Sequence, residues 1–502
     1  MQFSERRTLR KVSGGNNRKA TPVPIPNTEV KLPSADDTWV VTPRESRSPP
    51  DYMKKICDST GLFLYIRKKE SDMSDIKPSI QQLKWQKMEF TGFVHFGINT
   101  FTGREWGDGT EDPGAFDPRA LDAGQWVEVF KKAGMKLLIL TAKHHDGFCL
   151  WPSRFTEHSV KNSPWRNGTG DVVREAARAC KAGGIKFGIY MSPWDRHEKT
   201  YGDSKAYNEY YINQLTELLT SYGEITEVWL DGACGEGAGG KKQEYDWEGY
   251  YRVIRQHQPD ALIAICGPDI RWVGNEDGYA GETQWSVQER DGKVWWPSEC
   301  DVSIRPGWFY HKKEDGSVKT TKELLDIYYR SVGRNTVLLL NVPPDKRGLI
   351  NEIDAKRLEE LGEIIGSTFK DNQASGASIG TEEKMFEPGH PAYEILGGDY
   401  DRSWKIEGYE DGYSMIFDLK KRVEFDLVQI QEDISLGQKI GKYSIAVWDG
   451  QRWKNIVEGT TVGYKRINKT EKISTDKVCL TIEKAMGTPV ISSFGLYLEK
   501  DI

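Results

Sequence analysis

The 502-residue sequence lacks long apolar runs, because no stretch approaches the roughly eighteen consecutive apolar residues that a membrane-spanning helix needs. It also lacks a long run of lysine or arginine, and its 69 basic and 75 acidic residues give a net charge of -6. Nucleic-acid binding requires a concentrated basic surface. We therefore expect neither a membrane span nor a nucleic-acid partner.

Motifs for metals and cofactors are also missing. The seven cysteines form no CxxC pair, which argues against a zinc site and against a dense disulfide framework. No GxGxxG motif follows the first predicted strand, which disfavours a dinucleotide-binding fold. The sequence thus predicts a protein without a cofactor.

Aromatic residues, by contrast, are abundant, with 17 Trp and 22 Tyr in an otherwise polar chain. An indole ring packs well on the CH face of a sugar, whose hydroxyl groups stay free for hydrogen bonds. This composition favours a carbohydrate ligand.

The N-terminal residues 1–78 are predicted to form an extension. The first 48 or so are rich in Pro, Ser and Arg and show neither helical nor strand periodicity. The start also has no apolar core typical of a secretory signal. The compartment is left open.

Between residues 79 and 369, short apolar runs alternate with helix-like segments, which predicts an α/β fold. A (β/α)8-like TIM barrel and a doubly wound sheet both fit this alternation. The barrel is favoured because His, Asp and Trp residues follow the strands in HFG, TAKHHDGF, IYMSPWDR and WLDG, and a barrel brings such positions to one rim. The predicted strands are 92–96, 136–141, 186–190, 227–230, 261–266 and 336–340, and the predicted helices are 121–133, 171–182, 206–221, 247–257 and 353–365.

The C-terminal part has a different pattern. A polar, Gly/Ser-rich segment predicts a linker at 370–382, and alternating runs from 383 to 502 predict an antiparallel β-sandwich. Trp404, Trp448 and Trp453 could form a sugar-binding platform on this sandwich, which would make it a carbohydrate-binding module. Alternatively, they belong to its core.

Two carboxyl groups are the candidates for catalysis. Asp231 follows a predicted buried strand in EVWLDG, and Glu276 lies in the Trp-bearing loop GPDIRWVGNEDG. Hydrolysis of a glycoside needs one carboxyl that attacks or activates water and one that protonates the departing oxygen. Taken alone, each residue is better explained without catalysis, Asp231 as a turn or helix N-cap aspartate and Glu276 as a solvated loop glutamate.

Three of the eight histidines, His95, His144 and His145, also follow predicted strands. Adjacent histidines at a strand end point in different directions and rarely bind one metal ion. A neutral imidazole has one donor and one acceptor, which suits hydrogen bonding to sugar hydroxyls. We expect these residues to bind substrate and no metal.

Six runs of sequence, in order over about residues 84–345, resemble glycoside hydrolase family 29, the α-L-fucosidases. They are GFVHFGINTFTGREWGDGTEDP, LTAKHHDGFCLWPS, SPWDR, EVWLDGACGEG, GPDIRWVGNEDG and RPGWFYH. The resemblance implies a somewhat irregular barrel followed by a β-sandwich, and hydrolysis with retention of configuration. The forms GREWGDG, SPWDR and WVGNE look like the branch of the family that acts on α-1,3- and α-1,4-linked fucose in Lewis-type oligosaccharides.

Carried over by residue, the resemblance implies that Asp231 is the nucleophile and Glu276 the acid/base. It implies a fucosylated oligosaccharide as substrate and a secreted or periplasmic enzyme. The residues that it places around the fucose are His95, Glu105, Trp106, His144, His145, Tyr190, Trp229 and Trp308.

Alternatives are open at this stage. A metal-dependent hydrolase would use the histidines with Asp231, and a fucose lectin without catalysis would use the same pocket. Asp146 or Asp195 could replace Asp231 as nucleophile, and Glu282 or Glu299 could replace Glu276 as acid/base. The oligomeric state is not predicted.

Overall fold

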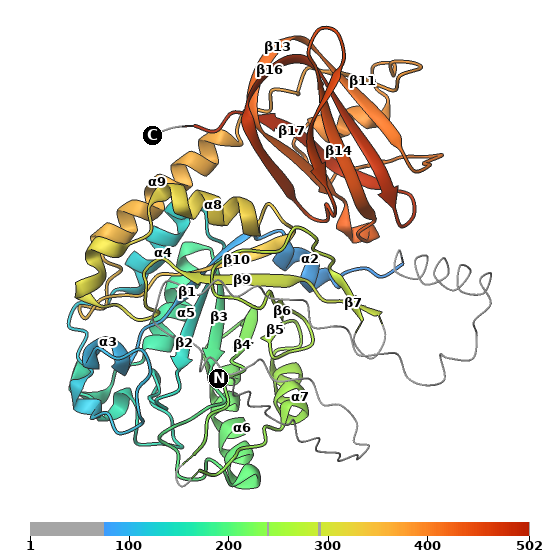
Figure 1. Ribbon diagram of the computed structural model, residues 1–502. Helices are drawn as coiled ribbons and strands as arrows, with labels where there is room; N and C mark the ends of the chain where they lie inside the picture. Colours follow the sequence, from blue (N-terminus) through green and yellow to red (C-terminus); the bar gives the residue numbers. More distant parts are fainter. Residues whose placement is uncertain (1–74, 238–239, 290–292, 501–502) are drawn as a thin grey trace, which may run out of the picture.

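A computed structural model of the protein describes residues 75–237, 240–289 and 293–500. A barrel is followed by an antiparallel β-sandwich, which confirms the predicted fold class (Figure 1). Nearly all of the N-terminal extension expected at 1–78 lies outside the described residues.

Eight parallel strands form the barrel in the order β5-β4-β3-β2-β1-β10-β9-β6. The two end strands of this order, β5 and β6, lie against each other, so the barrel is nearly closed. The strands are β1 (Phe90–Val94), β2 (Leu137–Lys143), β3 (Lys186–Met191), β4 (Glu227–Leu230), β5 (Leu262–Ile265), β6 (Arg271–Trp272), β9 (Ser298–Ser303) and β10 (Thr336–Asn341).

Helices cover the outside of the barrel, and their sequences explain where they start. Four of them begin after an aspartate whose side chain accepts a hydrogen bond from the first turn: Asp122, Asp171, Asp203 and Asp246. Helices α4 and α5 end at Gly134 and Gly184, whose positive φ angles of 87° and 75° favour glycine. The helices are α2 (Ile80–Gln86), α3 (Ile98–Thr102), α4 (Ala123–Ala133), α5 (Val172–Gly183), α6 (Ser204–Ser221), α7 (Trp247–His257), α8 (Thr321–Ser331) and α9 (Glu352–Thr368).

The barrel departs from regular βα alternation in its second half. A loop joins β5 to β6, and the hairpin of β7 (Val287–Glu289) and β8 (Lys293–Trp295) lies between β6 and β9. Strand β9 was not predicted, because polar side chains of Glu299, Asp301 and Ser303 occupy every second position and are buried.

Two tryptophan–carboxyl pairs lie inside the barrel. Trp85 of α2 donates its indole N–H to Glu227 at 2.7 Å, and Trp229 donates to Glu299 at 2.9 Å. Burial raises the pKa values of both glutamates, and that of Glu299 is raised further by the neighbouring Glu227. Burial thus favours the protonated form of both carboxyl groups, and their hydrogen bonds orient the two indole rings.

The sandwich consists of antiparallel strands, of which β13 and β16 are long and bend at register shifts. The segment expected as the linker, 370–382, adds Ala374, Ala377 and Ile379 to the sandwich core. The strands are β11 (Ser378–Gly380), β12 (Trp404–Lys405), β13 (Tyr413–Glu432), β14 (Ile440–Trp448), β15 (Trp453–Gly459), β16 (Arg466–Ala485) and β17 (Val490–Tyr497).

The three sandwich tryptophans do not form one platform. Trp404 is buried in the sandwich core. Trp448 and Trp453 face each other across the β14–β15 pair, with ring centroids 5.5 Å apart in an edge-on arrangement. Trp404 is therefore a core residue, as the alternative interpretation held.

The sandwich packs near the N-terminal ends of the barrel strands. Lys465 forms an ion pair with Glu89, which precedes β1, and Asn335, which precedes β10, accepts from the amide of Tyr464. In Figure 1 the arrows of β2 and β3 point away from the sandwich. The rim at the carboxyl ends of the strands therefore lies away from the sandwich.

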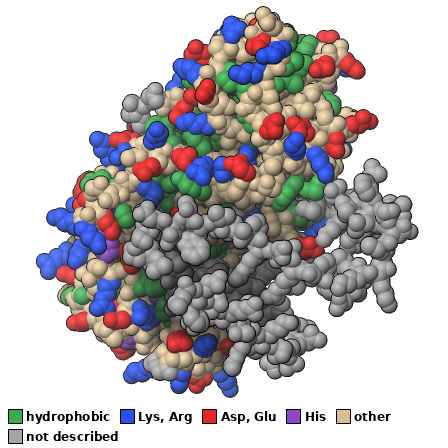
Figure 2. Space-filling view, in the orientation of Figure 1, with side chains coloured by type: hydrophobic (Ala, Val, Ile, Leu, Met, Phe, Trp, Pro, Cys, Tyr) green, Lys and Arg blue, Asp and Glu red, His purple; other side chains and the backbone are tan. Residues whose placement is uncertain are grey.

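Charged side chains of both signs are interspersed over the visible face of the barrel and the sandwich (Figure 2). This distribution agrees with the nearly balanced charge of the sequence. Among the described residues, no helix combines the length and apolar character required to cross a bilayer.

Candidate active site

A pocket lies at the carboxyl ends of the barrel strands, where TIM-barrel active sites are built. Both candidate carboxylates and seven of the eight predicted substrate-binding residues line it. The lining consists of Phe93, His95, Trp106, His144, His145, Tyr190, Trp229, Asp231, Ala233, Glu276, Asp301 and Trp308.

Asp231 follows the last residue of β4, and both of its carboxylate oxygens are hydrogen-bonded. The Tyr190 hydroxyl donates to Oδ2 at 2.8 Å, and the backbone amide of Ala233 donates to Oδ1 at 2.7 Å. Burial, together with the charge of Asp231, raises the pKa of Tyr190 well above its usual value. The tyrosine is therefore a permanent donor that fixes the orientation of the carboxylate.

Burial keeps the three histidines neutral: it lowers the pKa of His95 to about 3 and also lowers those of His144 and His145. His95 Nδ1 lies 2.9 Å from Asn341 Oδ1, while the Asn341 amide nitrogen donates to the carbonyl of Trp308. Asn341 Oδ1 must therefore accept from His95 Nδ1, which leaves Nε2 of the neutral ring as an acceptor.

His144 and His145 lie side by side, with ring centroids 4.2 Å apart. His145 Nδ1 contacts Ser192 Oγ at 2.7 Å, and its Nε2 lies 4.0 Å from Asp231 Oδ2. Within the described part of the chain, His144 Nδ1 is buried without a hydrogen-bond partner. Across the same residues, no group of three or more His, Cys, Asp or Glu side chains could hold a metal ion.

Aromatic rings form the inner wall of the pocket. Trp229 stacks on Tyr190 at a centroid distance of 5.3 Å, and Phe93 meets Trp229 edge-on at 5.3 Å. The Trp229 indole is oriented by its bond to Glu299 below it. The wall is thus built of ring faces in mutual contact.

Glu276 lies on the loop after β6 and lines the same pocket. Trp308, on the loop after β9, donates its indole N–H to Glu276 Oε2 at 3.3 Å. Trp308 also packs on His95, with ring centroids 5.0 Å apart. Trp308 therefore contacts a candidate catalytic residue and a candidate fucose-binding residue.

Glu105 and Trp106 take different positions although they are adjacent. Trp106 lies at the rim with 38% of its surface exposed, next to Trp194 at a centroid distance of 5.8 Å. Glu105 lies outside the lining, where it accepts from the Trp308 amide at 2.8 Å and pairs with His311 at 2.7 Å. Glu105 thus supports the loop that carries Trp308.

Sequence reasoning missed three residues of the lining, Phe93, Ala233 and Asp301. Asp301 lies on β9 and accepts from the Trp272 indole at 2.5 Å. Burial, together with the charge of Glu276, raises its pKa to about 8. The WPSECDVS segment gave no sign of this site, because its contacts come from residues distant in the sequence.

The alternative carboxylates have other partners. Asp195 forms a buried ion pair with Lys143 at 2.8 Å, and Asp146 accepts from Asn99 at 2.9 Å. Glu282 pairs with Arg466 at 2.6 Å where the barrel meets the sandwich, and Glu299 lies inside the barrel beneath Trp229. These four residues lie outside the pocket lining, which favours Asp231 and Glu276.

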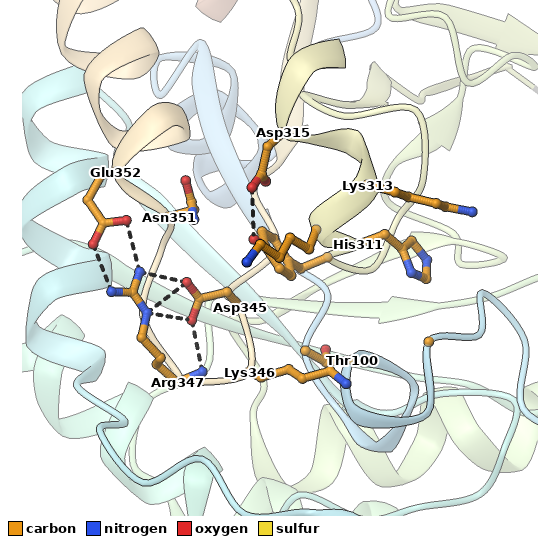
Figure 3. A pocket seen from close by; sticks show the side chains of 12 residues that line it. Thr100, His311, Lys313, Asp315, Asp345, Lys346, Arg347, Asn351 and Glu352 are labelled. Carbon is orange, nitrogen blue, oxygen red and sulfur yellow. Dashed lines mark hydrogen bonds and ion pairs between the residues drawn. The ribbon is translucent and has the colours of Figure 1, made fainter.

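A cleft of about 680 Å³ is lined by the end of α3 and by the loops after β9 and β10 (Figure 3). Arg347 is held between Asp345 at 2.7 Å and Glu352 at 2.9 Å, so one guanidinium is shared by two carboxylates. Asp315 is paired with Arg305 at 3.0 Å. These carboxylates of the cleft are therefore engaged in ion pairs.

The sequence model of the α-L-fucosidases matches residues 83–367, the range that forms the barrel and its pocket. The chain belongs to the α-L-fucosidase family. The fucosidase is 46% identical over 451 residues to α-L-fucosidase 1 of Arabidopsis thaliana, a match that covers 84% of this chain and 88% of the relative.

Solved structures show the same relationship. The fucosidase shares 34% identity and a TM-score of 0.78 with a family 29 fucosidase of Ruminococcus gnavus in complex with fucose, with 85% of this chain and 96% of that chain covered. A variant of that fucosidase with one aspartate replaced by alanine was also solved with fucose. A family 29 member from an unknown rumen bacterium shares 40% identity and a TM-score of 0.76, with 85% of this chain and 78% of that chain covered.

Proposed function

We propose that the protein is a retaining exo-α-L-fucosidase in which Asp231 is the nucleophile and Glu276 the acid/base. The observation that supports this proposal is that both carboxyl groups line one pocket, while the alternative carboxylates are engaged elsewhere. Asp231 is held by two donors, so its carboxylate has a fixed orientation before substrate binds.

The reaction proceeds in two displacements. An oxygen of Asp231 attacks the anomeric carbon, the glycosidic bond breaks, and Glu276 gives its proton to the departing oxygen. A fucosyl ester of Asp231 is formed. Glu276 then takes a proton from water, the hydroxyl attacks the anomeric carbon, and Asp231 leaves, so that fucose is released with its original configuration.

The other lining residues bind the sugar. The neutral His95 offers an acceptor at Nε2 to a sugar hydroxyl, and the ring of His144 lines the pocket beside it. Tyr190, Trp229 and Trp308 pack around the ring. His145 lies beside Asp231, Trp106 at the rim completes the pocket, and Glu105 acts indirectly by holding Trp308.

We further propose that the substrate is α-1,3- or α-1,4-linked fucose in a branched, Lewis-type oligosaccharide. Two motifs that resemble this branch of the family, REW and SPW, bring Trp106 and Trp194 into edge contact at the rim. At the mouth of the fucose pocket, the exposed Trp106 indole offers a surface on which a second sugar can stack.

A pair of substrates tests the linkage preference. The protein is incubated with a Lewis-type trisaccharide and with its unbranched fucosylated counterpart, and the released monosaccharide is identified. Release of fucose mainly from the branched substrate is expected. Equal release from both would contradict the preference but not the fucosidase activity.

We propose residues 79–369 as the catalytic unit, 370–382 as its connection to the sandwich and 383–502 as the sandwich unit. The match of the family model to residues 83–367 supports the bounds of the catalytic unit. The sandwich packs near the opposite ends of the strands from the pocket, so any sugar that it binds is separate from the fucose in the active site.

A further inference from the structure

Asp301 is a third carboxyl group in the pocket, beside Asp231 and Glu276. It lies near the carboxyl end of β9 and is 4% exposed. The two-displacement mechanism uses only two carboxyl groups. Asp301 therefore needs a different explanation.

The contact of Asp301 with Trp272 connects it to the loop that carries Glu276. Trp272 Nε1 donates to Asp301 Oδ1 at 2.5 Å, and Trp272 is only four residues before Glu276. Trp272 belongs to the two-residue strand β6, which pairs with β9. The Trp272–Asp301 hydrogen bond thus adds a side-chain contact to the two-residue backbone pairing of β6 with β9.

Beyond β6 the chain turns away from the barrel. The amide of Val273 still donates to the carbonyl of Glu299 at 3.1 Å, and Gly274 then adopts a φ of +100°. The loop is closed by Asn275, whose side chain donates to the carbonyl of Tyr279 at 3.0 Å. The position of Glu276 therefore depends on how β6 is held.

The charge of the pocket is consistent with a neutral Asp301. Among the described residues that line the pocket there is no lysine or arginine, and the three histidines are neutral. An ionised Asp301 would repel Asp231 and Glu276. A protonated Asp301 still accepts the Trp272 hydrogen bond and adds no charge to the site.

We propose that Asp301 is a positioning residue that, through Trp272, holds the loop of Glu276 so that this acid reaches the departing oxygen. The inference rests on the proposed role of Glu276. Trp308 contacts Glu276 directly, and Asp301 acts on the same residue through the backbone of its loop.

This role predicts a loss that depends on the leaving group. Asp301→Ala and Trp272→Phe each remove one end of the hydrogen bond, and kcat/KM is measured on a fucosylated oligosaccharide and on an aryl fucoside with a good leaving group. Each variant should lose about 30-fold or more on the oligosaccharide and less than about threefold on the aryl fucoside, because only the former needs the acid.

Two further variants separate positioning from a general structural effect. The double variant should lose no more than the worse single variant, because both changes break one interaction. Asp301→Asn keeps an acceptor for Trp272, so its kcat/KM on the oligosaccharide should be at least about tenfold higher than that of Asp301→Ala. The controls are Trp247→Phe on α7 and the exposed Asp277→Asn, and thermal melts check folding of each variant.

The outcomes distinguish this inference from the proposed function. Equal losses on both substrates, no loss, or additive losses would overturn the role of Asp301. Glu276→Gln is measured in parallel. If Glu276→Gln loses activity selectively on the oligosaccharide but Asp301→Ala and Trp272→Phe do not, only the role of Asp301 is overturned. If Glu276→Gln loses activity equally on both substrates, the role of Glu276 is overturned as well. If Asp301→Ala does not fold, Trp272→Phe decides alone.

Discussion

The hydroxyl of Tyr190 donates a 2.8 Å hydrogen bond to Oδ2 of Asp231. The two residues come from neighbouring parallel strands, because Tyr190 is in register with Trp229 and Asp231 follows two residues later. With Ala233 holding the other oxygen, the carboxylate is oriented before substrate arrives. Such preorganisation is what an attacking carboxylate requires.

Asp231→Ala should abolish turnover and preserve binding. The variant removes the group that forms the new bond, so kcat should fall by at least about a thousandfold, equivalent to about 4 kcal/mol. The histidines and aromatic rings that line the pocket stay, so the Kd for fucose should change by less than about tenfold. Steady-state kinetics and calorimetry measure the two quantities.

The matched control is Glu236→Ala, which removes an exposed carboxylate from the same loop. Its kinetics should equal those of the unaltered enzyme. Near-normal activity of Asp231→Ala would return attention to Asp146 and Asp195, which in this structure have other partners.

Glu276→Gln should show a dependence on the leaving group. An oligosaccharide departs as an alkoxide that needs a proton, so its hydrolysis should slow by about 100- to 10,000-fold, whereas the first step with an activated aryl fucoside should slow far less. Pre-steady-state kinetics should show a burst of aryl alcohol, because the same residue is needed to activate water in the second step. Asp277→Asn, on the same loop, serves as the control. Equal losses on both substrates would exclude Glu276 as the acid.

The stability of Asp301→Asn relative to the unaltered protein should increase as the pH rises. Burial raises the pKa of Asp301 to about 8, compared with 3.8 when unfolded. Between these values the unfolded chain is ionised and the folded chain is protonated, so the unaltered protein loses stability with rising pH. Asparagine cannot ionise. The free energy of unfolding of Asp301→Asn should therefore increase relative to that of the unaltered protein by up to about 2.7 kcal/mol between about pH 5 and pH 7.

Urea unfolding of both proteins at several pH values measures this difference, with Asp277→Asn as the exposed control. A difference in the free energy of unfolding that does not change with pH would show that Asp301 is ionised in the folded protein.

Much of the barrel could be predicted because its strands β1 to β5 and β10 are apolar runs that alternate with amphipathic helices. Strand β9 could not, because its inward positions carry Glu299, Asp301 and Ser303, and such a sequence is more typical of a loop. Its carboxyl groups are tolerated only because indole donors from Trp229 and Trp272 and bound protons compensate for their burial.

The candidate site, like the fold, could be predicted only in part from the sequence. The motifs placed His95, His144, His145 and Asp231 at strand ends, and barrel closure brings such ends together. By contrast, a motif does not give the direction of a side chain. Glu105 was therefore expected in the pocket, whereas its carboxylate accepts a hydrogen bond from the backbone amide of Trp308. Asp301 depends on a contact with Trp272 that only the folded barrel creates.

The most direct measurement of the central claim is the site of the covalent intermediate. Glu276→Gln is mixed with an activated aryl fucoside, quenched, digested and analysed by peptide mass spectrometry. We predict one fucosyl adduct, on the peptide that contains Asp231, and its loss when Asp231 is also replaced by alanine. A burst of aryl alcohol accompanied by an adduct on another carboxylate, or a first product of inverted configuration by proton NMR, would contradict the account.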